Sequence, residues 1–85
     1  MEDLFKKRCN YVSENPSLFP KDQLSELYGY YKQSMYGNAP RSSPSMIFNH
    51  REFQKWVLWD KCRDMTREEA MHCYIRLTSD WLMSH

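Results

Sequence analysis

The sequence predicts an all-helical fold, and three features of the chain support this interpretation. Apolar residues recur at intervals of three and four, as they do on a helix with one buried face. No long run of valine and isoleucine alternates with polar residues, as a half-buried strand would require. Proline, asparagine and glycine stand where such helices would begin and end. We therefore expect residues 1–85 to form a single small domain of four helices.

The first helix is expected over about residues 2–13. Glu2 and Asp3 lie in its first turn, where acidic side chains interact favourably with the helix dipole. Its apolar stripe consists of Phe5, Cys9 and Val12. The basic residues 6–8 are interpreted as the solvated face of this helix rather than as a targeting signal. Asn15 should end the helix, because the residue before a proline avoids the helical conformation.

The second helix is expected between Pro20 and Gly37, which suit its first position and its C-terminal cap. Its apolar stripe has the helical offsets 0, 3, 4, 7 and 11 and consists of Leu24, Leu27, Tyr28, Tyr31 and Met35. Tyr28 and Lys32 are four residues apart, so the phenol and the ammonium group lie one turn apart. With Tyr31 beside them, they suit a ligand that has a flat ring and an anionic group, such as a phosphorylated nucleotide. The alternative is a core helix whose tyrosine hydroxyls reach water and whose lysine snorkels.

A long irregular segment is expected over residues 38–49, and segments of this length often carry function. Its hydrophobic part is expected to tuck onto the bundle as a lid or plug. This part consists of Met46, Ile47 and Phe48. The third helix should begin at Asn49, because Glu52 follows three residues later in the pattern of an N-terminal cap. Its inward face is expected to consist of Phe53, Trp56, Val57 and Trp59.

The fourth helix should begin at Thr66, because Thr66 and Glu69 have the spacing of a capping box. Its apolar stripe repeats the offsets of the second helix and consists of Ala70, Cys73, Tyr74, Leu77 and Trp81. The chain has no internal repeat. The four helices are therefore expected to pack as one bundle.

Composition and charge argue against several classes of protein. A formal net charge of +1 gives no overall attraction for DNA or RNA, so no nucleic-acid partner is expected. Three cysteines without paired spacing indicate reduced thiols in a cytoplasmic protein rather than a disulfide framework. There is neither a signal-peptide pattern nor an apolar run long enough to span a bilayer, so no stable membrane insertion is expected.

The sequence offers no constellation for catalysis or metal binding. His72 and Cys73 are neighbours, so on a helix they point about 100° apart and cannot share a metal ion. The cysteines and histidines lack the short pair spacings of zinc sites. Two glycines cannot supply a glycine-rich phosphate loop. We expect no enzyme activity, no metal and no cofactor.

Four blocks of the sequence, in order, resemble the acyl-CoA-binding protein family. The first reads Leu-Tyr-Gly-Tyr-Tyr-Lys-Gln over residues 27–33 and is followed by Gly37. The others are Pro44-Ser45-Met46, then Lys55-Trp56-Val57-Leu58-Trp59, and finally Glu68-Glu69-Ala70-Met71 with Tyr74-Ile75. The resemblance covers nearly the whole chain. It implies an up-down-down-up four-helix bundle whose second and third helices are joined by the long loop.

The resemblance also implies a function and a binding site. The function would be the non-catalytic binding, buffering and intracellular transport of medium- to long-chain fatty acyl-CoA, by a monomer. Tyr28 and Lys32 match the family's pair at the 3′-phosphate of the ribose, and Tyr31 matches the tyrosine at the adenine. The remaining head-group contacts implied by the resemblance are Arg51, Lys55 and Tyr74.

Three departures from the family pattern bear on this site. Ser13 stands where the family has a phosphate-binding lysine, so Arg8 or Arg51 would have to supply that charge. Ser25 replaces an apolar residue near the acyl chain, where it would border the groove with Leu24. The segment between Met46 and Trp56 is one residue longer, so Arg51 and His50 compete for one basic role. Cys9 is expected near the ligand side of the first helix. The alternative function is a helical protein-interaction module of the same fold in which acyl-CoA binding is weakened or lost.

Overall fold

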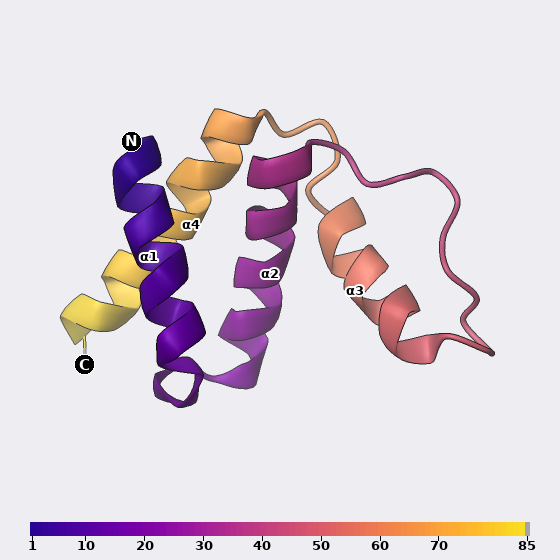
Figure 1. Cartoon of the computed structure of the whole chain (residues 1–85), viewed down its shortest axis with the longest axis horizontal. Helices are drawn as coiled ribbons and strands as arrows, with labels where there is room; N and C mark the ends of the chain where they lie inside the picture. Colours follow the sequence, from indigo (N-terminus) through magenta and orange to yellow (C-terminus); the bar gives the residue numbers. More distant parts are fainter. Residues whose placement is uncertain (85) are drawn as a thin grey trace.

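Four α-helices and one short 3₁₀ helix make up the regular structure of residues 1–84, the part of the chain that the computed structural model describes. They are α1 (Glu2–Glu14), η1 (Pro16–Leu18), α2 (Lys21–Tyr36), α3 (His50–Asp60) and α4 (Arg67–Ser84). This part contains no strand, so the all-helical prediction is confirmed. Figure 1 shows α2 and α3 running in the same direction and α1 and α4 in the opposite one, which is the expected up-down-down-up order.

The core lies where α1, α2 and α4 meet. Its buried residues are Phe5, Val12, Phe19, Leu27, Met71 and Tyr74. Phe5, Val12, Leu27 and Tyr74 belong to the apolar stripes predicted from the helical spacing. Met71 and Phe19, which lies in the link between α1 and α2, were not part of these stripes. In contrast, α3 buries no residue and packs chiefly against α2. Its predicted inward face, which includes Trp56 and Val57, is half-buried.

The helix ends follow the sequence signals with one exception. The backbone N–H of Thr66 donates to Glu69 Oε1, and the N–H of Glu69 donates to Thr66 Oγ1, both at 3.0 Å, which confirms the capping box. Hydrogen bonds from the backbone N–H of Thr66 and from its side chain lower the pKa of the Glu69 carboxyl. Gly37 ends α2 with a φ of 78°, a left-handed conformation that favours glycine. Asn49 precedes α3 as predicted, but its side chain makes no capping hydrogen bond.

The prediction that residues 46–48 form a lid on the bundle is wrong, because their side chains are exposed. The first part of the 38–49 segment is held by α3 instead. The indole N–H of Trp56 donates to Pro40 O and that of Trp59 donates to Gly37 O, each at 2.7 Å. The second part then leaves the bundle and turns back into α3 at its outer end (Figure 1).

Gly29 marks the point where α2 and α3 come closest. A Cβ atom at this position would overlap the backbone carbonyl oxygen of Leu58. We expect Gly29→Ala to lower the free energy of unfolding by about 1–3 kcal/mol, because an overpacked contact with backbone cannot relax by a rotamer change. The higher helix propensity of alanine, about 1 kcal/mol, works in the opposite direction.

Urea denaturation followed by circular dichroism measures this loss. The matched control is Ser25→Ala, one turn earlier in α2, whose hydroxyl donates only to Lys21 O of its own helix. Ser25→Ala should leave the free energy of unfolding unchanged or raise it slightly. A stabilised Gly29→Ala protein would show that α3 does not pack at this distance in solution.

Candidate functional site

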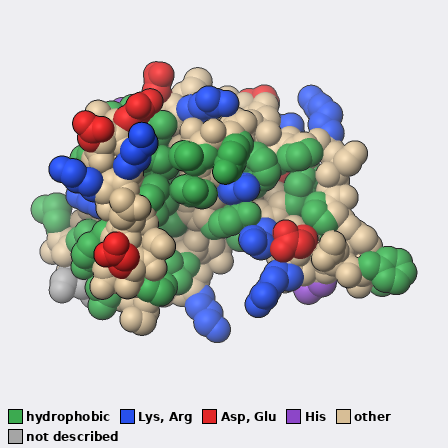
Figure 2. Space-filling view, in the orientation of Figure 1, with side chains coloured by type: hydrophobic (Ala, Val, Ile, Leu, Met, Phe, Trp, Pro, Cys, Tyr) green, Lys and Arg blue, Asp and Glu red, His purple; other side chains and the backbone are tan. Residues whose placement is uncertain are grey.

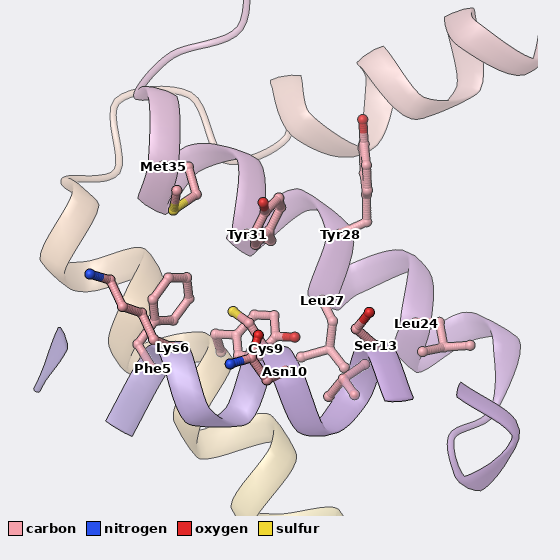
Figure 3. Close-up of a pocket in the computed structure, with 12 residues that line it drawn as sticks. Phe5, Lys6, Cys9, Asn10, Ser13, Leu24, Leu27, Tyr28, Tyr31 and Met35 are labelled. Carbon is pink, nitrogen blue, oxygen red and sulfur yellow. The ribbon is translucent and has the colours of Figure 1, made fainter. Parts of the chain in front are cut away.

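Hydrophobic side chains gather between α1 and α2 on the face shown in Figure 2, where a cavity of about 540 Å³ opens. From α1 it is lined by Phe5, Lys6, Cys9, Asn10, Val12 and Ser13. From α2 it is lined by Leu24, Leu27, Tyr28, Tyr31 and Met35. Tyr74 of α4 completes the lining. Figure 3 shows the two sets of side chains facing one another across the gap.

Helical spacing gives this cavity an apolar floor and a polar mouth. Phe5 and Val12 are buried, and Leu27 faces them from α2. Three α1 residues at the neighbouring helix positions are exposed at the mouth, namely Lys6, Asn10 and Ser13. Such a cavity can take an amphiphilic ligand, because the chain would be removed from water while the polar end stays hydrated.

Tyr74 and Cys9 form a neutral polar pair in the floor. The Tyr74 ring is 3% exposed and meets Phe5 edge to face, with 5.2 Å between the ring centroids. Burial raises the pKa of Tyr74, and the neighbouring Cys9, whose sulfur is hydrogen-bonded to the phenol, raises it further. Burial also raises the pKa of the Cys9 thiol. Both groups therefore stay protonated at neutral pH, so the thiol is a poor nucleophile.

A second group of side chains lies on the other side of α2, between α2 and α3. Tyr28 belongs to both groups, because it lines the cavity but points away from α1 toward α3 (Figure 3). Lys55 Nζ lies 5.4 Å from the centroid of the Tyr28 ring. Burial and the nearby Glu52 raise the pKa of the Tyr28 hydroxyl. Lys55 makes only a long ion pair with Glu52, at 3.9 Å, between two largely exposed side chains, so it can move to an anionic ligand at little cost.

Lys32 lies in an aromatic setting on the same side. Its Nζ is 4.5 Å from the centroid of the Tyr36 ring and 4.8 Å from that of Trp59. These cation–π contacts stabilise an ammonium group at a partly exposed site by about 0.5–1 kcal/mol. Lys32, Lys55 and Tyr28 thus place two cations and a phenol along the α2–α3 edge, next to an apolar cavity. No group of side chains in residues 1–84 could hold a metal ion.

Comparison with known proteins identifies the family of this chain. A family model described as Acyl CoA binding protein matches residues 2–78. The chain belongs to the acyl-CoA-binding protein family. The resemblance inferred from the sequence motifs is therefore confirmed.

Relatives in this family cover almost the whole chain. The acyl-CoA-binding protein of Saccharomyces cerevisiae is 31% identical over 85 residues, which are 100% of this chain and 97% of that protein. Acyl-CoA-binding protein 2 of Saccharomyces pastorianus is 35% identical over 75 residues, or 88% of this chain and 85% of that protein. The crystal structure of Oryza sativa Acyl-CoA-Binding Protein 2 superimposes with a TM-score of 0.84 at 28% identity, covering 98% of this chain and 89% of that one.

The structure brings most of the site residues expected for a member of the acyl-CoA-binding protein family into two neighbouring places. The cavity between α1 and α2 contains Cys9, Ser13, Leu24, Tyr28, Tyr31 and Tyr74. Lys32 and Lys55 lie on the α2–α3 edge. Ser25 lies neither in the α1–α2 cavity nor beside the two lysines. It lines a separate cavity of about 460 Å³ between α2 and α3, which His50 also lines. Arg51 is exposed in the first turn of α3.

Two expectations about charge are changed by the structure. Arg8 cannot replace the missing basic residue at position 13, because it is bound to α4. Its Nη1 donates to Thr78 Oγ1 at 2.9 Å, to Ser79 Oγ at 2.7 Å and to Ile75 O at 3.3 Å. Lys6 is exposed, as expected for a residue of the solvated face, but it also lines the mouth of the cavity. The signal for this was its spacing of seven residues from Ser13, two turns along one face.

Proposed function

We propose that this protein binds medium- to long-chain fatty acyl-CoA thioesters without catalysis and buffers and carries them in the cytoplasm as a monomer. One observation carries the proposal. In a member of the acyl-CoA-binding protein family, a cavity lined by Tyr28 and Tyr31 lies on one side of α2, and Lys32 and Lys55 lie on the other side, toward which Tyr28 points. The acyl chain would occupy the floor and the nucleotide would lie across α2.

The head group would be held by Lys32, Lys55 and Tyr28 through its phosphates, and by Tyr31 through the adenine. A charge-assisted hydrogen bond to phosphate stabilises by about 1.5–3 kcal/mol. This exceeds the contribution of a cation–π contact at a partly exposed site, so Lys32 would gain by moving from its aromatic neighbours to the ligand. Stacking of adenine on Tyr31 would add about 1–3 kcal/mol, by analogy with base stacking on aromatic side chains. Arg51, exposed nearby, would be a further phosphate contact.

The other expected residues would have smaller roles. Cys9 and Leu24 would contact the chain, and the neutral state of Cys9 favours storage of a thioester over attack on it. Ser13 would replace a charged contact by a hydrogen bond. Tyr74 would touch the ligand through the part of its surface that faces the cavity. A contact between Ser25 and the chain stays a prediction, since Ser25 lines the other cavity.

Lys32→Ala is expected to weaken the binding of palmitoyl-CoA roughly tenfold, because one charge-assisted hydrogen bond to phosphate is lost. Isothermal titration calorimetry of the wild-type protein and the variant tests both this residue and the proposal. The matched control is Lys7→Ala, which removes an exposed lysine of α1 that does not line the cavity. If the wild-type protein shows no saturable binding of palmitoyl-CoA, the proposed function is wrong. If Lys7→Ala weakens binding as much as Lys32→Ala, the effect of Lys32 is only one of net charge.

A further inference from the structure

The outer end of the 38–49 segment carries adjacent apolar side chains that the fold leaves uncovered. We call residues 46–48 the tip. Met46 is 60% exposed, Ile47 is 83% exposed and Phe48 is 91% exposed. Single exposed apolar residues are common, but two neighbouring large ones exposed to this degree at one projecting point are not explained by folding. Figure 2 shows a hydrophobic side chain standing out from the surface beyond the outer end of α3.

The backbone of the tip is folded into a turn. The N–H of Phe48 donates to Ser45 Oγ at 3.1 Å, and the N–H of Asn49 donates to Ser45 O at 2.9 Å. The N–H of Phe53 then donates to Asn49 O at 2.9 Å, which continues the turn into α3. The apolar side chains are therefore presented outward by ordered backbone, and little conformational entropy remains to be lost when they are buried by a partner.

The charged residues next to the tip in the sequence are all basic. None of the 11 acidic residues of the chain lies between Leu27 and Arg51. Over the same stretch the 38–49 segment and the start of α3 carry Arg41, His50 and Arg51. The first acidic side chain beyond them, Glu52, is paired with Lys55. The tip thus combines exposed apolar side chains with basic residues that lie close to it in the sequence.

We propose that the tip docks reversibly on the surface of an anionic lipid bilayer. Ile47 and Phe48 would enter the boundary between head groups and acyl chains, and Arg41 would lie among the anionic head groups. None of the helices within residues 1–84 is long and apolar enough to cross a membrane, so the contact is peripheral. It is independent of acyl-CoA binding, because the cavity between α1 and α2 does not include residues 46–48, and of these residues only Met46 lines the other cavity, between α2 and α3.

The shape of the tip favours lipid over a protein partner. A stable protein interface buries about 800 Å² on each partner and centres on packed aromatic or arginine anchors. The tip offers two large side chains on a convex projection, which matches the soft interface of a bilayer better than the surface of a folded protein. The same argument disfavours a second copy of this chain as the occupant.

Co-sedimentation with vesicles, in the absence of acyl-CoA, tests the proposal. The vesicles contain phosphatidylcholine either alone or mixed with phosphatidylserine. The wild-type protein should bind the mixed vesicles more strongly, and the double variant Ile47→Ser with Phe48→Ser should lower the partition coefficient roughly tenfold or more. The matched control is Met83→Ser, because Met83 is 87% exposed in the last turn of α4, at the other end of the molecule (Figure 1). Arg41→Ala should weaken binding to the mixed vesicles but not to the vesicles of phosphatidylcholine.

Three outcomes would overturn the proposal. They are no binding of the wild-type protein to the mixed vesicles, an equal loss in Met83→Ser, and a self-association in sedimentation velocity that the double variant abolishes. Calorimetry with palmitoyl-CoA in solution separates this test from that of the proposed function. The double variant should keep the wild-type affinity there, whatever its binding to vesicles.

Discussion

Coenzyme A without an acyl chain is expected to bind roughly a thousandfold or more weakly than palmitoyl-CoA. Most of the floor of the cavity is built from apolar side chains such as Phe5 and Val12, and its polar groups, Tyr74 and Cys9, are hydrogen-bonded to each other. Each methylene removed from water contributes about 0.8 kcal/mol, so ten of them contribute about 8 kcal/mol before the loss of chain freedom is subtracted. This exceeds what any single contact to the head group supplies.

Calorimetric titration with acyl-CoA esters that differ in chain length measures this dependence. Affinity should rise with each added pair of methylenes until the cavity is filled. Palmitate is the complementary ligand, because it keeps the chain but lacks the phosphates that Lys32 and Lys55 would bind. It should bind more weakly than palmitoyl-CoA. Equal affinity for palmitate, or an affinity that does not change with chain length, would contradict the assignment of head and tail.

Phe5→Ala is expected to lower the free energy of unfolding by about 3–5 kcal/mol. Phe5 is 2% exposed, and its ring packs edge to face on Tyr74 between α1 and α4. Removing it leaves a void that neighbouring helices can fill only in part, and the edge-to-face contact is lost as well. In a small domain this is a large share of a total stability of about 5–15 kcal/mol.

Urea denaturation monitored by circular dichroism gives this value. Phe5→Leu should lower the free energy of unfolding clearly less, because most of the side-chain volume is retained. Leu4→Ala is the control for a change at the neighbouring position, since Leu4 is largely exposed, and it should have little effect. A loss in Leu4→Ala as large as that in Phe5→Ala would mean that α1 packs through a different face.

Most of the fold could be predicted from the sequence because its signals are local. The apolar stripes, the capping box of Thr66 and Glu69, and the left-handed end of α2 at Gly37 each depend on residues within about three helical turns of one another. The structure contains these features where they were expected. The order of the helices, in contrast, came from the resemblance to a family, since helical spacing alone does not say which helices lie side by side.

The position of residues 46–48 could not be predicted, because it is set by contacts over long separations in the chain. Their hydrophobicity favoured burial. Instead, the indoles of Trp56 and Trp59 bind the carbonyl oxygens of Pro40 and Gly37, which places the first half of the segment along α3. Of the remaining residues, Met46 lines the cavity between α2 and α3 but is largely exposed, and Ile47 and Phe48 are exposed. No pattern in the sequence indicates which acceptor a tryptophan N–H will reach.

The candidate site likewise could be predicted only where it depends on residues close together in the sequence. Residues of α2 could be assigned to one face from their spacing, and Tyr28 and Tyr31 do line the cavity. The basic residues of α1 could not be separated in this way. Arg8 turns to the hydroxyls of Thr78 and Ser79, about 70 residues away in sequence, whereas Lys6 faces the cavity. This division depends on where α4 packs, and a basic run in the sequence does not contain that information.

Because α3 packs chiefly against α2, the local opening of α3 would be coupled to the binding of a ligand between these two helices. A helix with no buried residue opens at a lower free energy than the core helices. A ligand that binds both Lys32 of α2 and Lys55 of α3 would stabilise the packing of α3 against α2. By thermodynamic linkage, a change that makes the opened state of α3 more populated would lower the affinity for a ligand that binds only when α3 is in place.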